Sequence, residues 1–594
     1  MPKQMRVLVF LLVAISAFML LAACNSGNGD GGAVGTAPST SQVQPQDPAV
    51  AAAPEGVRPS TLAPLSAPAA SAPASRPADA IVGSSPVKRV VIAMVGPTDE
   101  RNSNRAGTVG WQLGPMYEYV ANVNPESGAY EPVLAEKWTI SIDEIKFKFR
   151  DGVQFHNGWG EFTANDFAHA VDNLMHPDNL AGDQYRRNLE GVEVINDREA
   201  VVKTKVVNVT LFRNLSQFTG GFEIASLKNF EAAGEFPGLD DQAMAGTGPY
   251  QYDERSDGSY IRFKRVPYQH WRVTPDFEEL ELRFISEEST RLAALLAGEV
   301  HITPLATDLH RPAFDRGMSL VKGTIPAKRT MINYLCCYLN DRTDAGMGYV
   351  HPDVPMMDVK VRRALSKAID RDALNQALFN GGGENVLVQG YNQRSDGWNP
   401  EWEQRYPTQF GYDPAAARAL LAEAGFGPNN PYEVSIILLN AYRGLPEGQD
   451  IMLAVANMMR DIGVETKIEG MDNSAKSSKA RAFEFDNHLD LRQTSSDLFT
   501  NVFIYASQYG RTPGSFIIPR LNELHLAARA TMDQAEHTKI FRKIGEIMVE
   551  QNQSIPLLWI PTVMIYNPDV VSEWRFPGSL INLFSHFENI QAAR

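Results

Sequence analysis

The sequence contains very few cysteines: Cys24, Cys336 and Cys337 are the only three in 594 residues. Three thiols cannot build the disulfide framework of a small secreted domain, so that class of protein is excluded. Cys336 and Cys337 are adjacent, and disulfide geometry strains the peptide between neighbouring cysteines. We therefore expect two buried thiols at this pair and a separate role for Cys24.

The chain also lacks an excess of basic residues. It has 55 Lys and Arg against 70 Asp and Glu, and a formal net charge of −15. An acidic surface argues against a nucleic-acid partner, because binding to phosphates needs a basic face.

The motifs of the common hydrolases and of metal sites are missing as well. No His-Glu-x-x-His, no Gly-x-Ser-x-Gly and no phosphate-binding loop occurs. His301 and His310 are too far apart for one helical face, and the other histidines are scattered. The sequence thus predicts no metal site, no cofactor and a protein that binds rather than catalyses. A secreted hydrolase stays open as an alternative, because scattered residues can converge in space.

Only one long apolar run is present, residues 7–21, and Lys3 and Arg6 precede it. It is shorter than the about 20 residues of a membrane span, and with its basic start it is typical of a secretory signal. The sequence "LAAC" that ends at Cys24 resembles the bacterial lipobox, in which the cysteine is lipidated and the chain is cut before it. We predict a signal peptide over residues 1–23 and a lipid anchor on Cys24. An ordinary secretory signal with a chance cysteine is the alternative.

Aromatic residues are absent from residue 19 to residue 110. Residues 24–85 are mostly Ala, Pro, Ser, Gly and Thr, and such a segment cannot bury enough apolar surface to offset the entropy of ordering. Its prolines favour an extended chain. We predict a disordered tether over residues 24–85 that holds a folded body away from a membrane.

The remaining residues, 86–594, exceed what one hydrophobic core usually supports, so two or more lobes are expected. Residues 145–158 alternate apolar and charged side chains and then turn at Asp151 and Gly152, which predicts a hairpin. Thr163 and Asp413 each stand before a helical pattern as its N-cap. This irregular mixture of strand and helix patterns predicts a multi-lobed α/β protein.

A set of motifs occurs in a fixed order along these residues. "LAEKW" at 134–138 is followed by "FKFRDGVQFHNG" at 147–158, "GTGPY" at 246–250, "TRLAALLAGEVHI" at 290–302 and "SIPLLWIPTVMIYNPDV" at 554–570. Together they resemble the extracellular solute-binding proteins of ABC importers, specifically the large peptide- and nickel-binding family. The resemblance covers nearly all of residues 87–594.

The resemblance implies an α/β fold of the two-lobed periplasmic-binding-protein type II (Venus flytrap), with a hinge between the lobes. Lobe I would comprise residues 86–325, completed by residues 546–594, and lobe II would comprise residues 326–545. The family implies a monomeric, lipid-anchored receptor in the cell envelope, on the periplasmic or extracellular face. It would deliver a peptide-like or other small polar solute to ABC permease subunits. A ligand-binding partner of a sensor or assembly protein is the alternative on the same fold.

In the family, ligand contacts come from three regions. The first corresponds to residues 110–120, where Trp111 and Tyr117 would line the cleft. The second is the loop after the run of glycines, where Tyr391, Arg394 and Trp398 are the candidates. A loop that is both polar and aromatic suits a wall that stacks on a ligand and also hydrogen-bonds it.

The third region is residues 488–510, where peptide binders carry an aspartate that pairs with the α-ammonium group of the ligand. Asp497 is the candidate for this aspartate, although the Trp and both prolines of the family's motif are absent. Arg492 is a cation where the family is usually apolar, and it suits an anionic or carboxylate-bearing solute if it faces the cleft. If it points outward, that inference disappears, so the class of solute stays open.

Other residues of the motifs are expected to be structural. His156 is predicted to be a hydrogen-bonded structural residue rather than a metal ligand. In the helical pattern that starts near residue 358, an apolar stripe is predicted to be core, and Arg362, Arg363 and Lys367 are predicted to form a solvated face.

Overall fold

A computed structural model of the protein describes residues 65–66, 87–94, 111–124, 129–177, 183–205, 211–217, 222–233, 245–323, 328–341, 345–393, 395–440, 442, 445–494, 516–575 and 586–594. The chain divides into the units Met1–Arg58 and Pro59–Arg594, and every described residue belongs to the second. None of the described helices is both long and apolar enough to span a bilayer. The predicted signal peptide, Cys24 and most of the predicted tether lie outside the described residues.

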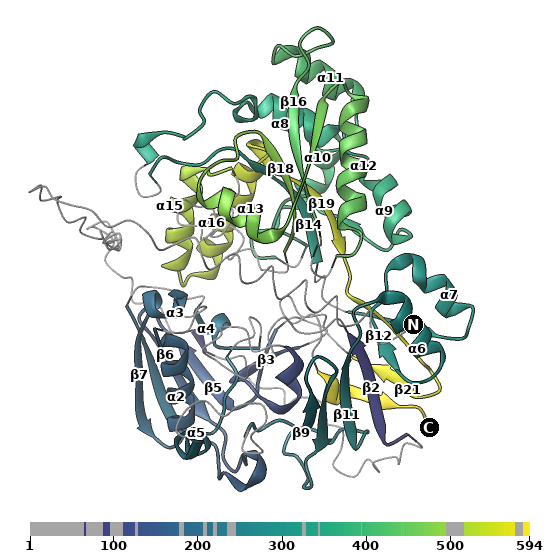
Figure 1. The fold of residues 1–594 in the computed structure, drawn as a ribbon. Helices are drawn as coiled ribbons and strands as arrows, with labels where there is room; N and C mark the ends of the chain where they lie inside the picture. The colour runs from purple at the N-terminus through teal and green to yellow at the C-terminus, as the bar shows by residue number, and fades with distance from the viewer. Residues whose placement is uncertain are drawn as a thin grey trace, which may run out of the picture. The chain divides into compact units, whose positions relative to one another are not determined.

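The first of the three larger sheets that the described residues form has five antiparallel strands in the order β1-β5-β6-β8-β7, and Figure 1 labels β5, β6 and β7 of it. Its strands are β1 (Leu65–Ser66), β5 (Ala135–Ile140), β6 (Glu144–Phe149), β7 (Leu189–Asn196) and β8 (Glu199–Thr204). β1 comes from the segment that we expected to be a tether, and Leu65 pairs with Ile140 of β5. On β6 the buried side chains alternate with exposed charged ones, so that one face of the strand is apolar.

That apolar face packs on α2 (Ala164–Met175), whose Phe167 ring lies 5.0 Å from the rings of Phe147 and Phe149. α2 begins where the sequence predicts. The Thr163 hydroxyl accepts a hydrogen bond from the amide of Asn165, and the Asp166 carboxylate accepts from the amide of Thr163 at 2.8 Å. The helices α3 (Asp183–Asn188), α4 (Leu211–Asn214) and α5 (Leu227–Ala233) belong to the same part of the chain.

The hairpin predicted for residues 145–158 does not form. β6 pairs with β5 on one side and with β8 on the other, while the residues after the turn make only an isolated bridge between Gln154 and Glu161. The prediction is wrong because β8, about 50 residues further along the chain, takes the place beside β6. The alternation of apolar and charged side chains depends only on neighbouring residues, whereas tertiary contacts determine which strand pairs with it.

The second sheet has seven strands in the order β13-β20-β12-β2-β11-β10-β9. The strands are β2 (Arg89–Met94), β9 (Tyr250–Ser256), β10 (Tyr260–Arg265), β11 (Glu279–Phe284), β12 (Ile302–Thr303), β13 (Ser319–Lys322) and β20 (Val563–Tyr566). Helices α6 (Glu288–Leu296) and α7 (His310–Phe314) follow β11 and β12. β2 is buried almost throughout and pairs in parallel with both β11 and β12.

The C-terminal part of the chain completes this half of the protein. β20 is inserted between β12 and β13, and β21 (Val571–Trp574) pairs with β22 (Ile590–Ala592). Trp574, Phe587 and Ile590 share a core with Val90 and Ile92 of β2. In Figure 1 the C-terminal strands, of which β21 is labelled, are yellow and lie near the purple β2. A smaller pair, β3 (Ala121–Val123) with β4 (Tyr130–Pro132), lies earlier in the chain.

The third sheet has six strands in the order β15-β19-β14-β18-β16-β17. The strands are β14 (Lys328–Leu335), β15 (Glu384–Asn385), β16 (Glu433–Leu439), β17 (Glu465–Met471), β18 (His488–Thr494) and β19 (Ser554–Ile560). The return to the seven-stranded sheet therefore takes place between Ile560 and Val563, later than residue 546 where we expected it. Among the described residues of the same part of the chain there are eight helices: α8 (Val359–Lys367), α9 (Arg371–Phe379), α10 (Glu401–Gln409), α11 (Pro414–Glu423), α12 (Gly448–Asp461), α13 (Asn473–Arg481), α15 (Pro519–Arg529) and α16 (Gln534–Glu550).

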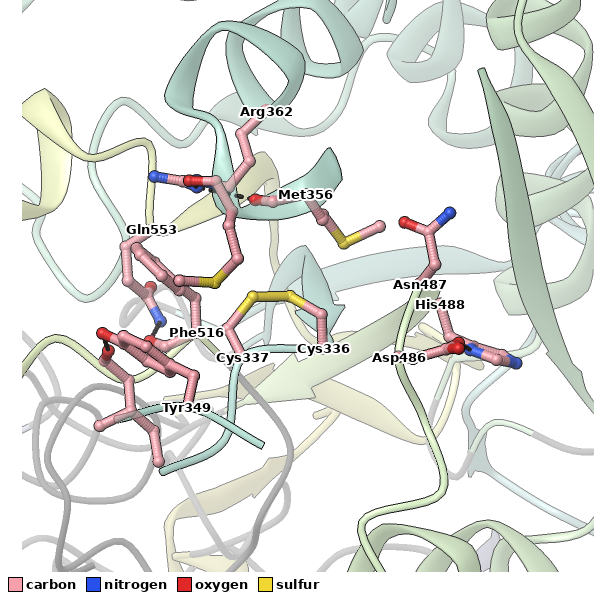
Figure 2. Close-up of a disulfide and its surroundings, with 12 residues drawn as sticks. Cys336, Cys337, Tyr349, Met356, Arg362, Asp486, Asn487, His488, Phe516 and Gln553 are labelled. Carbon is pink, nitrogen blue, oxygen red and sulfur yellow. Dashed lines mark hydrogen bonds and ion pairs between the residues drawn. A yellow bond between two sulfur atoms is a disulfide. The ribbon is translucent and has the colours of Figure 1, made fainter. Parts of the chain in front are cut away.

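Cys336 and Cys337 are both fully buried, as predicted, but they form a disulfide with each other (Figure 2). The expectation of two thiols is therefore wrong. In a strand, neighbouring side chains point to opposite faces, and two sulfur atoms on opposite faces cannot bond. β14 ends at Leu335, so the cysteines lie just beyond the strand, where the backbone is free of this alternation.

The predicted solvated face of α8 is also wrong for two of its three residues. Arg362 and Lys367 are buried, and only Arg363 is exposed. The Arg362 guanidinium donates to the backbone carbonyls of Met356 and Gln551 at 2.7 Å each. Burial lowers the pKa of Arg362 to about 10. Carbonyl acceptors rather than carboxylates satisfy this cation, and helical periodicity gives no sign of such an environment.

Candidate functional site

In the part of the chain that the structure describes, two connections lead from the seven-stranded to the six-stranded sheet or back. One leads from β13 to β14 and the other from β19 to β20. The described ends of these two connections lie side by side, because Lys322 pairs with Val563, Lys328 pairs with Ile560, and the amide of Gly323 donates to the carbonyl of Thr562 at 2.8 Å. A pair of adjacent crossings is the arrangement that a hinge needs.

Both sheets direct the carboxyl ends of their parallel strands toward these crossings. Thr494 at the end of β18 lies opposite Arg329 of β14, and β16 and β17 run in the direction of β18. Thr303 at the end of β12 lies opposite Ile565 of β20, and β2 and β11 run in the direction of β12. Ligands of open α/β sheets bind beyond the carboxyl ends of the strands. The candidate site is therefore the region beyond the carboxyl ends of the parallel strands of both sheets, beside the crossings.

Arg492 lies on β18, two residues before the carboxyl end of this strand at Thr494. Leu489 and Leu491 of the same strand belong to the main hydrophobic core, so Asp490 and Arg492 point to the opposite face of the sheet. About 23% of the Arg492 side chain is exposed, whereas Asp490 is fully buried. A partly exposed cation thus stands on the strand that leads into the candidate site.

Asp490 holds two cations. The Nζ atom of Lys476, on α13, lies 3.2 and 3.1 Å from its carboxylate oxygens, and Nε of Arg492 lies 2.8 Å from Oδ2. Burial lowers the pKa of Lys476, and the charge of Asp490 opposes this shift. A carboxylate without solvent contact is stable only when it is paired in this way. The ion pair fixes the direction in which the Arg492 side chain leaves the strand.

Tyr391 and Trp398 come together, but within the core of the six-stranded part. Both rings contact Trp402 edge-on, at centroid distances of 5.0 and 5.2 Å. Tyr391 is fully buried, and its hydroxyl donates to the backbone carbonyl of Phe541 in α16. Burial raises the pKa of Tyr391. Trp398 is half-buried, and so has the more accessible ring of the two.

Tyr117 is buried in the core of the seven-stranded part, directly after the short helix η1 (Trp111–Met116). The next residue, Glu118, accepts hydrogen bonds from Trp271 at 3.2 Å and from Arg272 at 2.8 Å. Arg272 also donates to Glu588, near the C-terminus, at 2.9 Å. A buried charge network therefore fixes the backbone of the first predicted ligand region.

The motif residues around this region serve as scaffold. Nε2 of His156 lies 2.7 Å from the carbonyl of Gly248, which confirms the predicted structural role of this histidine. Burial lowers the pKa of His156 to about 4, so the ring is neutral. A Cβ atom on Gly246 would come within 1.9 Å of the carbonyl oxygen of Met116. The motif "GTGPY" thus needs its first glycine for a close approach between two backbones.

Four predicted residues are not placed. Cys24, Arg394 and Asp497 lie outside the described residues, and of Trp111 only the backbone is described. Among the residues that the structure does describe, no group of three or more His, Cys, Asp or Glu side chains is arranged to hold a metal ion.

Sequence reasoning missed Lys476 and Asp490. An available signal was the pattern of β18, in which two leucines alternate with Asp490 and Arg492, since that pattern places both charges on one face. No pattern indicates Lys476, because it comes from a helix 14 residues before Asp490 and reaches it only through the tertiary fold.

Comparisons with known proteins agree with this architecture. The model of a protein family described as bacterial extracellular solute-binding proteins, family 5 Middle, matches residues 129–513. The dipeptide-binding protein of Escherichia coli K12 is 24% identical over 516 residues, which cover 80% of this chain and 89% of that protein.

Solved structures of low sequence identity share the fold. A dipeptide-binding protein from Pseudoalteromonas sp. SM9913 in complex with Met-Leu is 19% identical, with a TM-score of 0.66 over 85% of this chain and all of that one. The binding protein AgaA of Agrobacterium tumefaciens R10 in complex with agropinic acid is also 19% identical, with a TM-score of 0.63 over 85% of this chain and 99% of that one. The predicted two-lobed α/β fold is confirmed.

Proposed function

Because the chain belongs to the bacterial extracellular solute-binding proteins of family 5, we propose that it is the lipid-anchored receptor of an ABC importer. It captures a peptide-like or other small polar solute and delivers it to the permease. It acts as a monomer in the cell envelope and performs no chemistry on the solute. Cys24 carries the lipid, and residues 24–85 link the anchor to the folded body.

The observation that carries this proposal is the position of the carboxyl strand ends beside two adjacent crossing segments. Loops from both sheets can then contact one solute, and a rotation about the crossings can close them around it. A solute that contacts both sheets binds the closed form better than the open one, so it shifts the population toward the closed form. The permease then distinguishes a loaded receptor from an empty one by its shape.

The charges near the carboxyl end of β18, in the six-stranded sheet, favour a solute with a carboxylate. Arg492 is directed by the buried Asp490, and the Asp497 position follows five residues later along the chain. A peptide offers a carboxylate to Arg492 and an ammonium group to Asp497. The dipeptide-binding relative supports this class, and a receptor structure that holds agropinic acid makes another anionic solute the second candidate.

The remaining predicted residues would form the walls of the site. Trp111, Arg394 and Trp398 would contact the solute, while the buried rings of Tyr117 and Tyr391 would support these walls from behind. Aromatic rings supply apolar contact area, and a few charged groups fix the orientation of the solute.

The proposal is tested first with the full chain in detergent, by native mass spectrometry followed by denaturing release of any bound solute. A released peptide or other carboxylate, recovered unchanged, supports the receptor. A solute recovered as its hydrolysis product would instead indicate the secreted hydrolase. A protein that comes empty and binds neither Met-Leu nor other carboxylates in calorimetry would contradict the proposal and favour the partner of a sensor or assembly protein.

Calorimetry on Arg492→Gln then tests the charge of the site. We expect an affinity for Met-Leu reduced by about 10-fold or more, since a hydrogen bond to a charged group contributes roughly 1.5–3 kcal/mol. Arg492→Lys should retain part of the affinity. Arg460→Gln, at an exposed arginine of α12, is the matched control and should bind as the unchanged chain does. Equal affinity of Arg492→Gln and the control would remove Arg492 from the site.

A further inference from the structure

A hydrogen bond joins two residues that are 341 positions apart in the sequence. Nη2 of Arg529, on α15, donates to Oδ1 of Asn188, on α3, at 2.6 Å (both helices are labelled in Figure 1). Arg529 belongs to the six-stranded part, whereas Asn188 is the last residue of α3 and directly precedes β7 of the five-stranded sheet. Neither residue lies in a crossing between the seven-stranded and the six-stranded sheet, so this contact is separate from the hinge.

The five-stranded and the seven-stranded sheet form one body. Nε2 of His156, which follows β6, lies 2.7 Å from the carbonyl of Gly248, which precedes β9. The Arg150 guanidinium, also after β6, lies 4.5 Å from the centre of the Trp271 ring, which comes after β10. The two sheets are therefore one half of the protein, and the six-stranded part is the other half. A rotation about the crossings changes the separation of α3 from α15.

The acceptor of the hydrogen bond is held in place by the five-stranded sheet. The carbonyl of Asn188 accepts from the amide of Lys205 at 2.9 Å, and the next residue, Leu189, pairs with Thr204 in the ladder of β7 and β8. Nζ of Lys205 also donates to the carbonyl of Arg186, in α3, at 2.9 Å. Because the sheet fixes the backbone that carries the Asn188 amide, this group cannot follow α15 when the two halves separate.

The donor, Arg529, is a half-buried cation, and burial lowers the pKa of its guanidinium. Among the described residues, no carboxylate lies within ion-pairing distance of it. His525, one turn earlier on α15, supplies no charge either, since burial lowers the pKa of its ring to about 3. The amide oxygen of Asn188 is therefore the group that compensates this cation for lost water.

Another contact between the two halves is weaker. Oγ1 of Thr307, in the short helix η3 (Thr307–Leu309), lies 3.5 Å from Oε1 of Glu447, the N-cap of α12. This distance is at the outer limit of a hydrogen bond. Burial raises the pKa of Glu288, on α6, and the negative charge of Glu447 adds to this shift. The two carboxylates repel each other across the halves, so the bond between Arg529 and Asn188 is the stronger attraction.

We propose that the hydrogen bond from Arg529 to Asn188 is a latch that holds the two halves together in the empty protein and so sets the ratio of closed to open form. A hydrogen bond is lost when its donor and acceptor move apart by about 1 Å, so the latch exists in the closed form alone. The inference rests on the proposed function for its effect on solute affinity. That effect needs no contact between latch and solute, because both act on one equilibrium between open and closed forms.

The test measures the distance between the halves of the full chain in detergent by pulsed electron paramagnetic resonance. Spin labels are attached at Ile195→Cys in β7 and at Leu453→Cys in α12, two exposed positions on different halves. Cys336 and Cys337 are bonded to each other and do not take the label. The distance distribution then gives the ratio of closed to open form.

The substitutions compared are Arg529→Gln, Asn188→Ala, the two combined, and Asn188→Asp. Arg520→Gln is the matched control, because Arg520 is an exposed arginine of the same helix whose ion pair, with Glu523, lies within that helix. We expect Arg529→Gln and Asn188→Ala each to lower the ratio of closed to open form by about 5-fold, the effect of one hydrogen bond. The combined variant should match either single one, since both remove the same bond.

Asn188→Asp should raise the ratio, because a carboxylate forms an ion pair with the half-buried cation. A merely structural loss would not reproduce this rise. Calorimetry with Met-Leu follows, and in every variant the affinity should change by the same factor as the fraction of closed form.

Equal ratios in Arg529→Gln and Arg520→Gln, or no closed form in the empty unchanged chain, would overturn the inference. Should Arg529→Gln not fold, Asn188→Asp still decides, since an unchanged ratio in that variant also overturns the latch. If Met-Leu binds to none of the variants and not to the unchanged chain, the proposed function fails, whereas the distances in the empty chain still test the latch.

Discussion

Replacing Asp490 with asparagine tests the buried charges behind Arg492. Asp490 has no solvent contact, and the Lys476 side chain beside it is only 6% exposed. Removing one partner of a buried pair typically costs about 3–5 kcal/mol, because the other charge stays buried. Lys476 can limit this cost by losing its proton. With an unfolded-state pKa of about 10.4, deprotonation of Lys476 at pH 7 costs roughly 4.6 kcal/mol, which is the upper bound of the destabilisation that comes from the Lys476 charge.

The same argument predicts a pH dependence with a definite sign. Burial already lowers the pKa of Lys476 in the folded protein, and Asp490 opposes this shift. Without Asp490 the folded-state pKa lies further below the unfolded value. The destabilisation is therefore fully present below the folded pKa, and it is lost as the pH rises toward about 10.4. The difference in free energy of unfolding between the unchanged chain and Asp490→Asn should therefore shrink steadily between neutral pH and pH 10.

Urea unfolding, followed by circular dichroism at several pH values, measures this effect. At a slope of about 2–3 kcal/mol/M, the midpoint of the six-stranded part should fall by roughly 1–2 M at pH 7. Asp461→Asn, at an exposed aspartate of α12, is the control and should shift the midpoint by little. Adding Lys476→Met to Asp490→Asn should restore most of the loss. A deficit that is independent of pH, or that Lys476→Met does not reduce, would refute the reasoning.

Two further substitutions test the seven-stranded part. Gly246→Ala should destabilise the protein by about 3 kcal/mol or more in urea unfolding, since its Cβ would overlap the Met116 carbonyl. The control is Gly114→Ala, which has open space around the new methyl group and should change the free energy of unfolding by less than about 1 kcal/mol. Equal effects of the two substitutions would contradict the close approach at Gly246. Although burial alone would raise it, the charge of Arg272 lowers the pKa of Glu588. Glu588 therefore stabilises the fold above its unfolded pKa of about 4.3, and this contribution is lost as the pH falls through the folded value. Glu588→Gln should then be less stable than the unchanged chain at pH 7 by about 2–4 kcal/mol, and the difference should narrow below about pH 4; a constant difference would show that the charge is not involved.

Local patterns in the sequence predicted the elements that depend on neighbouring residues. The Thr163 cap and the alternation along β6 follow from the geometry of a helix start and of a strand, and both occur where expected. The structural role of His156 follows from its motif. The resemblance of the ordered motifs predicted the two-lobed α/β fold. Such motifs identify a fold because residues such as Gly246 are needed for one particular close approach between two backbone segments.

Contacts between distant residues were decided by the tertiary structure alone. The partner of β6, the carbonyl environment of Arg362 and the ion pair of Lys476 with Asp490 join parts of the chain that no local pattern relates. The disulfide shows the same limit. The sequence placed two adjacent cysteines in an apolar stretch, and whether they bond depends on where β14 ends, which its partner strands determine. Side-chain periodicity records which face of an element is buried, whereas the identity of the groups that meet there is fixed only when the sheets assemble.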